Sequence, residues 1–123
     1  EEVPHKHLQR DGSNLLFDLY VNFADASLGT AVEIPTLEGK AKVKIEPGTQ
    51  AGKVLRLKGK GLPSVNAYGR GDLLVNINVW TPQHLSSEEK KLLEKLRESP
   101  NFRPNPGKND KSFYEKMREF FHS

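Results

Sequence analysis

The sequence predicts a small, mainly β protein: a two-layer antiparallel β-sandwich with short helices and a C-terminal amphipathic helix. Within residues 15–80, apolar and polar side chains alternate in several short stretches, which is the pattern of half-buried strands. Glycine- and proline-containing turns separate these stretches, and no crossover helix is evident between them. Five or six strands joined in this way favour a sandwich or an open barrel.

Four segments carry the strand pattern. They are residues 15–23, the hairpin 31–45 with its turn at 37–39, the short segment 54–57, and residues 73–80. In each of them the apolar side chains share one face of the extended chain, because successive side chains of a strand point to opposite sides. The side chains expected to face the core are Leu15, Phe17, Leu19, Val21, Phe23, Val32, Ile34, Ala41, Val43, Ile45, Leu55, Leu57, Leu73, Val75, Ile77 and Val79.

Two helices are expected after the strands, on either side of a linker. The first follows Ser86 and Glu89, which have the spacing of a capping box, and it ends before Pro100; its leucine stripe can pack on the sandwich. Three prolines after residue 99 predict a stiff, extended linker. We therefore divide the chain into a connector from a preceding domain (1–13), a β-sandwich domain (14–98), and a proline-rich linker with a final helix (99–123).

The final helix, predicted over residues 112–121, has one strongly apolar face. At about 100° per residue, its large apolar side chains fall within a sector of roughly 120°, and its charged side chains lie opposite. A helix this short is marginal alone in water, and such a face needs a cover. The chain's own sandwich or a second copy of the chain can supply it, and we expect the second copy. The side chains assigned to this dimer contact are Phe113, Tyr114, Met117, Phe120 and Phe121.

Four further apolar side chains are out of phase with the core residues of their strands: Leu16, Tyr20, Leu74 and Trp80. The simpler interpretation is that they cover the second layer of the sandwich. The alternative is that they form an apolar groove for extended peptides, and we retain them as a candidate binding site on that basis.

Sites for chemistry are not evident. The chain has no cysteine, and its four histidines lack the spacing of a metal site. The run GTQAGK lacks the spacing and the serine or threonine of a phosphate loop, and the glycines at 59 and 61 do not continue into a dinucleotide motif. No two carboxylates are paired by the pattern as acid and base. We expect no catalytic residue, no metal and no enzymatic activity.

The charge pattern gives weak support for nucleic acid as a partner. The 19 basic and 16 acidic residues are interleaved, with a net charge of only +3. A basic β-module that binds nucleic acid remains an alternative, and its residues would be Lys40, Lys42, Lys44, Arg56 and Lys58; a solvated sheet face explains the lysine row more simply. Neither a membrane span nor a signal peptide is evident, and we expect a cytoplasmic protein.

The residues resemble the second C-terminal β-domain of bacterial DnaJ-type (J-domain) co-chaperones. The match runs almost continuously over residues 5–97, through segments such as SLGTAVEIPTLEGKAKVKIEPGTQAG and GRGDLLVNINVWTPQHLSSEEKKLLEKL, and the tail SFYEKMREFF resembles the ending of bacterial members. Of the family's leader H-x-x-F-x-R-x-G, His5, Arg10 and Gly12 match, while Leu8 replaces a frequent phenylalanine. Because the sequence begins with Glu1 and a polar connector, we expect a fragment of a longer protein. The His-Pro-Asp loop, the Gly/Phe-rich linker and the CxxCxGxG zinc repeats of the family are missing, so we expect that this fragment does not by itself stimulate a DnaK-type ATPase.

The resemblance implies a function as well as a fold. It implies a sandwich with a short helix near residues 25–28, homodimerisation through residues 110–122, and binding of unfolded client polypeptides for delivery to a DnaK-type ATPase chaperone. The principal client groove of relatives belongs to the preceding β-domain, and zinc would belong to missing N-terminal parts, so no cofactor is expected in this fragment. A purely structural interdomain module is the remaining alternative.

Overall fold

The computed structural model describes residues 8–63, 69–107 and 112–122. The chain divides into two compact units, Glu1–Pro82 and Gln83–Ser123, which we describe separately. Residues 14–98 were expected to form one sandwich domain, whereas this division places the helix after residue 86 in the second unit.

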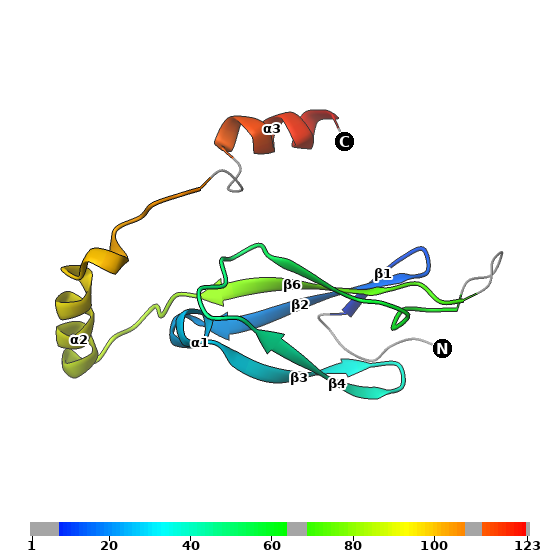
Figure 1. The fold of residues 1–123 in the computed structure, drawn as a ribbon, viewed down its shortest axis with the longest axis horizontal. Helices are drawn as coiled ribbons and strands as arrows, with labels where there is room; N and C mark the ends of the chain where they lie inside the picture. The colour runs from blue at the N-terminus through cyan, green and yellow to red at the C-terminus, as the bar shows by residue number, and fades with distance from the viewer. Residues whose placement is uncertain (1–7, 64–68, 108–111, 123) are drawn as a thin grey trace. The chain divides into compact units, whose positions relative to one another are not determined.

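The first unit is a small β-sandwich, as predicted (Figure 1). One layer is a four-stranded sheet of order β1-β2-β6-β5, and the other is the two-stranded sheet β3-β4. A short helix, α1, lies between β2 and β3, where the family resemblance implied one. The elements are β1 (Leu8–Asp11), β2 (Asn14–Asn22), α1 (Phe23–Leu28), β3 (Thr30–Thr36), β4 (Gly39–Ile45), β5 (Val54–Leu57) and β6 (Leu73–Trp80).

The central pair of the four-stranded sheet, β2 and β6, is parallel, whereas an antiparallel sandwich was expected. Their register runs from Leu15 opposite Leu73 to Asn22 opposite Trp80. A parallel pair requires a long crossover connection. Here residues 23–72 provide it, and they include α1, the whole second layer and β5. The other three strand pairs are antiparallel.

The core lies between the two layers, and all of its buried side chains except Ala26 of α1 are among those that the alternation predicted. Leu73, Val75 and Ile77 of the central strand are fully buried. The remaining buried side chains are Leu15, Phe17, Leu19, Val21, Ala26, Ile34, Val43 and Ile45. Because each fully buried aliphatic side chain contributes about 1.5–3 kcal/mol, this cluster dominates the stability of the unit.

Two predictions about β2 were wrong at its ends. Phe23 is not a core residue of the strand: it begins α1 and is 39% exposed. The strand stops because the side-chain oxygen of Asn22 accepts a hydrogen bond from the Asp25 amide at 2.7 Å, which caps the helix. At the other end, residues 8–11 of the expected connector form the edge strand β1, with Leu8 opposite Phe17.

The second unit contains α2 (Ser87–Arg97), the short 3-10 helix η1 (Pro100–Phe102) and α3 (Phe113–His122). The capping box of α2 is confirmed, since the Ser86 amide donates to Glu89 Oε1 at 2.8 Å and the Glu89 amide donates to Ser86 Oγ at 3.1 Å. No residue of α2 is buried.

Glycines allow the loop between β5 and β6 to pass directly against the β1-β2 turn. The Leu62 amide donates a hydrogen bond to the Ser13 carbonyl at 2.8 Å, and the Gly71 amide donates one to the Leu62 carbonyl at 2.8 Å. A Cβ atom on Gly71 would lie 2.1 Å from the Ser13 oxygen, and one on Gly61 would lie 2.6 Å from it. Only glycine therefore fits at these two positions.

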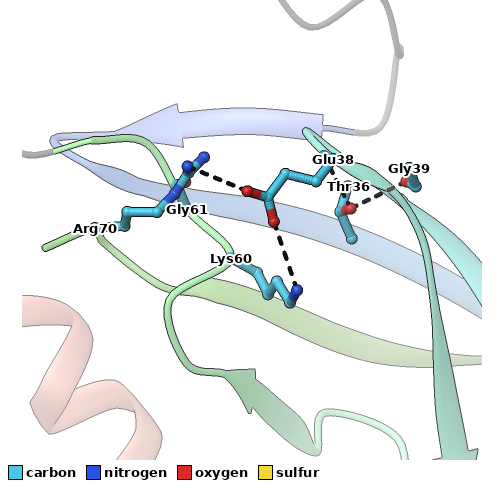
Figure 2. A network of polar contacts seen from close by, with 6 residues as sticks. All are labelled: Thr36, Glu38, Gly39, Lys60, Gly61 and Arg70. Carbon is cyan, nitrogen blue, oxygen red and sulfur yellow. Dashed lines mark hydrogen bonds and ion pairs between the residues drawn. The ribbon is translucent and has the colours of Figure 1, made fainter.

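An ion-pair clasp connects the tip of the β3-β4 hairpin to this loop (Figure 2). The Glu38 carboxylate forms ion pairs with Lys60 Nζ, at 3.6 Å, and with Arg70 Nη1, at 3.4 Å. Arg70 Nε also donates a hydrogen bond to the Gly61 carbonyl at 3.1 Å. Thr36 holds the turn by donating to the Gly39 carbonyl and accepting from the Glu38 amide. Because exposed ion pairs are weak, the clasp adds little to the stability of the unit.

The close approach at Gly71 yields a stability prediction. Gly71→Ala is expected to lower the free energy of unfolding by about 3 kcal/mol, because the methyl group overlaps backbone atoms that cannot move easily. Gly52→Ala is the matched control: Gly52 has a positive φ but open space around its Cβ position, so about 1–2 kcal/mol is expected. Urea unfolding followed by Trp80 fluorescence measures both, and equal losses would contradict the steric argument.

Candidate functional site

The four predicted outward-facing residues all lie on the outer face of the four-stranded sheet. Leu16 is opposite Leu74, and Trp80 is opposite Asn22, which shares a face with Tyr20 on β2. The second layer packs on the other face of this sheet, where the core side chains lie. The simpler interpretation, that these four residues cover the second layer, was therefore wrong.

The four residues form two separate pairs rather than one continuous groove. Tyr20 and Trp80 are about half exposed, and their rings meet edge to face with centroids 6.5 Å apart. Leu16 and Leu74 are only partly exposed, and they lie four residues before Tyr20 on β2 and six residues before Trp80 on β6.

A polar row separates the two apolar pairs. Asp18 Oδ1 accepts hydrogen bonds from the side-chain amide groups of Asn76, at 3.1 Å, and Asn78, at 3.3 Å. These bonds fix the orientation of the two amide groups on the sheet surface. The aromatic pair can contact an apolar side chain, while the neighbouring Asn78 side chain offers polar contacts to a peptide backbone.

The basic residues of the nucleic-acid alternative do not form one surface. Lys40, Lys42 and Lys44 lie on the outer face of β3-β4, where their register partners are Pro35, Glu33 and Ala31. Arg56 is opposite Leu74, on the outer face of the other sheet, and Lys58 is in the turn that follows β5. In a sandwich the two outer faces point in opposite directions, and Arg56 is also paired with Asp72 at 3.4 Å. The structure therefore separates these residues.

Helix α3 exposes the apolar face that the sequence predicted. Phe113, Tyr114, Phe120 and Phe121 are 77, 69, 71 and 74% exposed, and Met117 is partly exposed. The rings of Phe120 and Phe121 meet edge to face at 5.3 Å, and the Arg118 guanidinium lies 5.9 Å from the centre of the Tyr114 ring.

A second capping box, which the sequence analysis missed, begins α3. The Ser112 amide donates to Glu115 Oε1 at 2.9 Å, and the Glu115 amide donates to Ser112 Oγ at 3.1 Å. The signal was available in the sequence, because S-x-x-E before an apolar run is the pattern already recognised at Ser86. This box satisfies two amide groups at the helix start and helps a short helix to form.

The described residues contain no group of three metal-ligating side chains and no buried side-chain polar atom without a partner. His5 and His7 lie outside the described residues. The GTQAGK run forms the turns between β4 and β5, and the Lys53 carbonyl accepts a hydrogen bond from the Ile77 amide. None of the described helices is both long and apolar enough to cross a membrane.

Comparison with known proteins identifies the family. The family model of the DnaJ C terminal domain matches residues 1–82, which is also the range of the first compact unit. The chain is 59% identical over 121 residues to Chaperone protein DnaJ of Bacteroides fragilis and 46% identical over 123 residues to that of Salinibacter ruber. Each match covers 98% of this chain but only 30% and 32% of the relative's length. The chain therefore belongs to the DnaJ C-terminal domain family.

Proposed function

We propose that this chain joins two protomers of a DnaJ-type co-chaperone and holds unfolded client polypeptides for a DnaK-type ATPase chaperone. The observation that carries the proposal is the exposed apolar face of α3 in a chain of this family. The mechanism is geometric, and no bond is made or broken. Two weak client sites, linked by the dimer contact, gain about 10² or more in avidity through effective concentration.

The properties of α3 favour a second copy of the chain as the cover for its apolar face. Four aromatic side chains and one methionine offer a surface that can pack against an identical surface about a two-fold axis. The opposite side carries two acidic and two basic side chains, so like-charge repulsion does not oppose the approach of two copies. The capping box at Ser112 and Glu115 prepares the helix for this contact.

The Tyr20–Trp80 pair is the part of the predicted client surface that we retain for client contact. It is half exposed, aromatic, and adjacent to polar side chains whose orientation Asp18 fixes. Rigid aromatic side chains provide apolar contact area at a low cost in conformational entropy. Leu16 and Leu74 are less exposed and lie beyond the polar row, so we assign them a minor contribution.

The dimer contact predicts a change of mass on substitution. The double variant Phe113→Ser, Phe121→Ser is expected to shift the chain from dimer to monomer at tens of micromolar, because each lost ring removes about 2 kcal/mol of apolar burial. Serine and phenylalanine have similar helix propensities, so the helix itself is little affected. Light scattering after gel filtration measures the mass. Lys116→Ser on the polar side is the control and keeps the dimer; a monomeric parent chain would refute the assignment.

Loss of the α3 capping box is predicted to weaken the dimer without changing the contact surface. Ser112→Ala is expected to destabilise α3 by about 1 kcal/mol and to raise the dimer dissociation constant several-fold. Sedimentation equilibrium measures the constant. Ser87→Ala is the control, because this serine is the first residue of α2 and does not cap α3. It should leave the dimer dissociation constant unchanged. An unchanged constant in Ser112→Ala would show that the helix start does not limit assembly.

The aromatic pair predicts a loss of client holding without a loss of assembly. The double variant Tyr20→Ser, Trp80→Ser is expected to suppress the aggregation of an unfolded client several-fold less well than the parent chain, because both exposed rings are removed. Turbidity of a heat-denatured model protein measures this effect. Val54→Ser, an exposed apolar residue on β5 of the same sheet, is the control. If the parent dimer fails to suppress aggregation at all, the purely structural alternative is favoured.

A further inference from the structure

The apolar face of α3 has the only sulfur atom of the chain at its centre. The sequence contains one methionine, Met117, and no cysteine. Phe113 and Tyr114 lie four and three residues before it on the helix. Phe120 and Phe121 lie three and four residues after it. Residues at these spacings are neighbours on a helix surface, so the thioether of Met117 occupies the middle of the proposed dimer contact.

This thioether can be reached by a small dissolved oxidant when α3 has no cover. Met117 is partly exposed, and the four rings around it are between 69 and 77% exposed, so the face is open to water in the single chain. Hydrogen peroxide is hardly larger than water and can reach such a side chain. A second copy packed on the same face would exclude it. The sulfur atom therefore reacts more readily in the monomer than in the dimer.

The reaction requires only a peroxide as co-reactant. The sulfur lone pair attacks one oxygen of hydrogen peroxide, an S–O bond forms as the O–O bond breaks, and the second oxygen takes up a proton and leaves as water. The sulfur atom is oxidised by two electrons and the peroxide is reduced. The product, methionine sulfoxide, carries a polar hydrogen-bond acceptor where a soft, apolar group stood before.

A sulfoxide at this position opposes assembly because the apolar face offers few hydrogen-bond donors. Of the four aromatic side chains around Met117, only Tyr114 carries an O–H group, and the three phenylalanine rings carry no donor. A polar group buried without a partner lowers the stability of the contact, whereas in the monomer the sulfoxide is hydrated. In a two-fold dimer both copies bring the same group into the same contact, so the effect occurs twice.

We propose that Met117 is a site of reversible oxidation by peroxide and that its sulfoxide separates the dimer. The inference rests on the proposed dimer contact and adds a regulation of that contact. The reverse step removes the oxygen as water while a reductase oxidises two thiols to a disulfide. Because avidity for clients depends on two linked sites, oxidation converts a two-site holder into a one-site holder. The Tyr20–Trp80 pair itself stays unchanged.

The test compares the chain as prepared, after hydrogen peroxide, and after subsequent treatment with the two methionine sulfoxide reductases, one for each sulfoxide epimer. Peptide mapping by mass spectrometry measures the fraction of Met117 that carries one added oxygen atom, and sedimentation equilibrium measures the dimer dissociation constant. Full oxidation is expected to raise this constant at least about tenfold, and the reductases to restore it. Oxidation should also be slower at protein concentrations above the dissociation constant, because the dimer covers the sulfur atom.

Two substitutions at the same position separate the sulfur chemistry from the packing. Met117→Leu conserves volume and apolar character, so it should keep the dimer and remove its response to peroxide. Met117→Gln introduces a polar group at a helix propensity close to that of methionine, so it should weaken the dimer about tenfold without any peroxide.

The outcomes distinguish this inference from the proposed function. A monomeric parent chain would overturn the dimer contact and the inference with it. If the parent is a dimer whose dissociation constant is unchanged at full oxidation of Met117, only the redox inference is overturned. An equal response of Met117→Leu to peroxide would also overturn it, because the effect would then come from another side chain.

Discussion

The in-register parallel pairing of β2 with β6 is the constraint on which the rest of the first unit depends. In a strand, side chains alternate between faces, so one register decides for both strands which residues are buried. Leu15, Leu19, Leu73 and Ile77 then face the second layer, and Tyr20 and Trp80 face outward. A slip of β6 by one residue would turn Trp80 toward the inner face of the sheet and would turn Val75 and Ile77 toward water. The aromatic pair and the core are therefore consequences of the same pairing.

The parallel pairing also positions the two other surfaces of the unit. Since residues 23–72 must cross from the end of β2 to the start of β6, they carry α1 and the β3-β4 hairpin over the inner face of the sheet. The lysines of β4 then lie on the opposite side of the sandwich from Tyr20 and Trp80. The chain thus presents two chemically distinct outer faces, one with the aromatic pair and the polar row, the other with the lysines of β4 and Glu33.

The parts of the fold that follow from local pattern were predictable, and the long-range ones were not. Two-residue alternation was sufficient to predict the core residues Val75 and Ile77, and helical periodicity was sufficient for the apolar face of α3. The parallel direction of β2 and β6 was not evident, because it depends on how the crossover folds rather than on any short segment. Strand β1 was missed because three of its four residues are polar, and Phe23 was misplaced because the capping role of Asn22 was not considered. The separation of Arg56 from the lysine row arises only when distant segments meet.

The proposed function depends above all on a second copy of the chain covering the apolar face of α3. An isotope-filtered NOE experiment on a mixture of ¹³C-labelled and unlabelled chains tests it most directly, because it detects only contacts between different molecules. We predict intermolecular contacts between the Met117 methyl group of one protomer and the rings of Phe113 and Phe121 of its partner. If the filtered spectrum shows no such contacts, while an unfiltered spectrum places the Met117 methyl group against the chain's own β-sandwich, a second copy does not cover the apolar face.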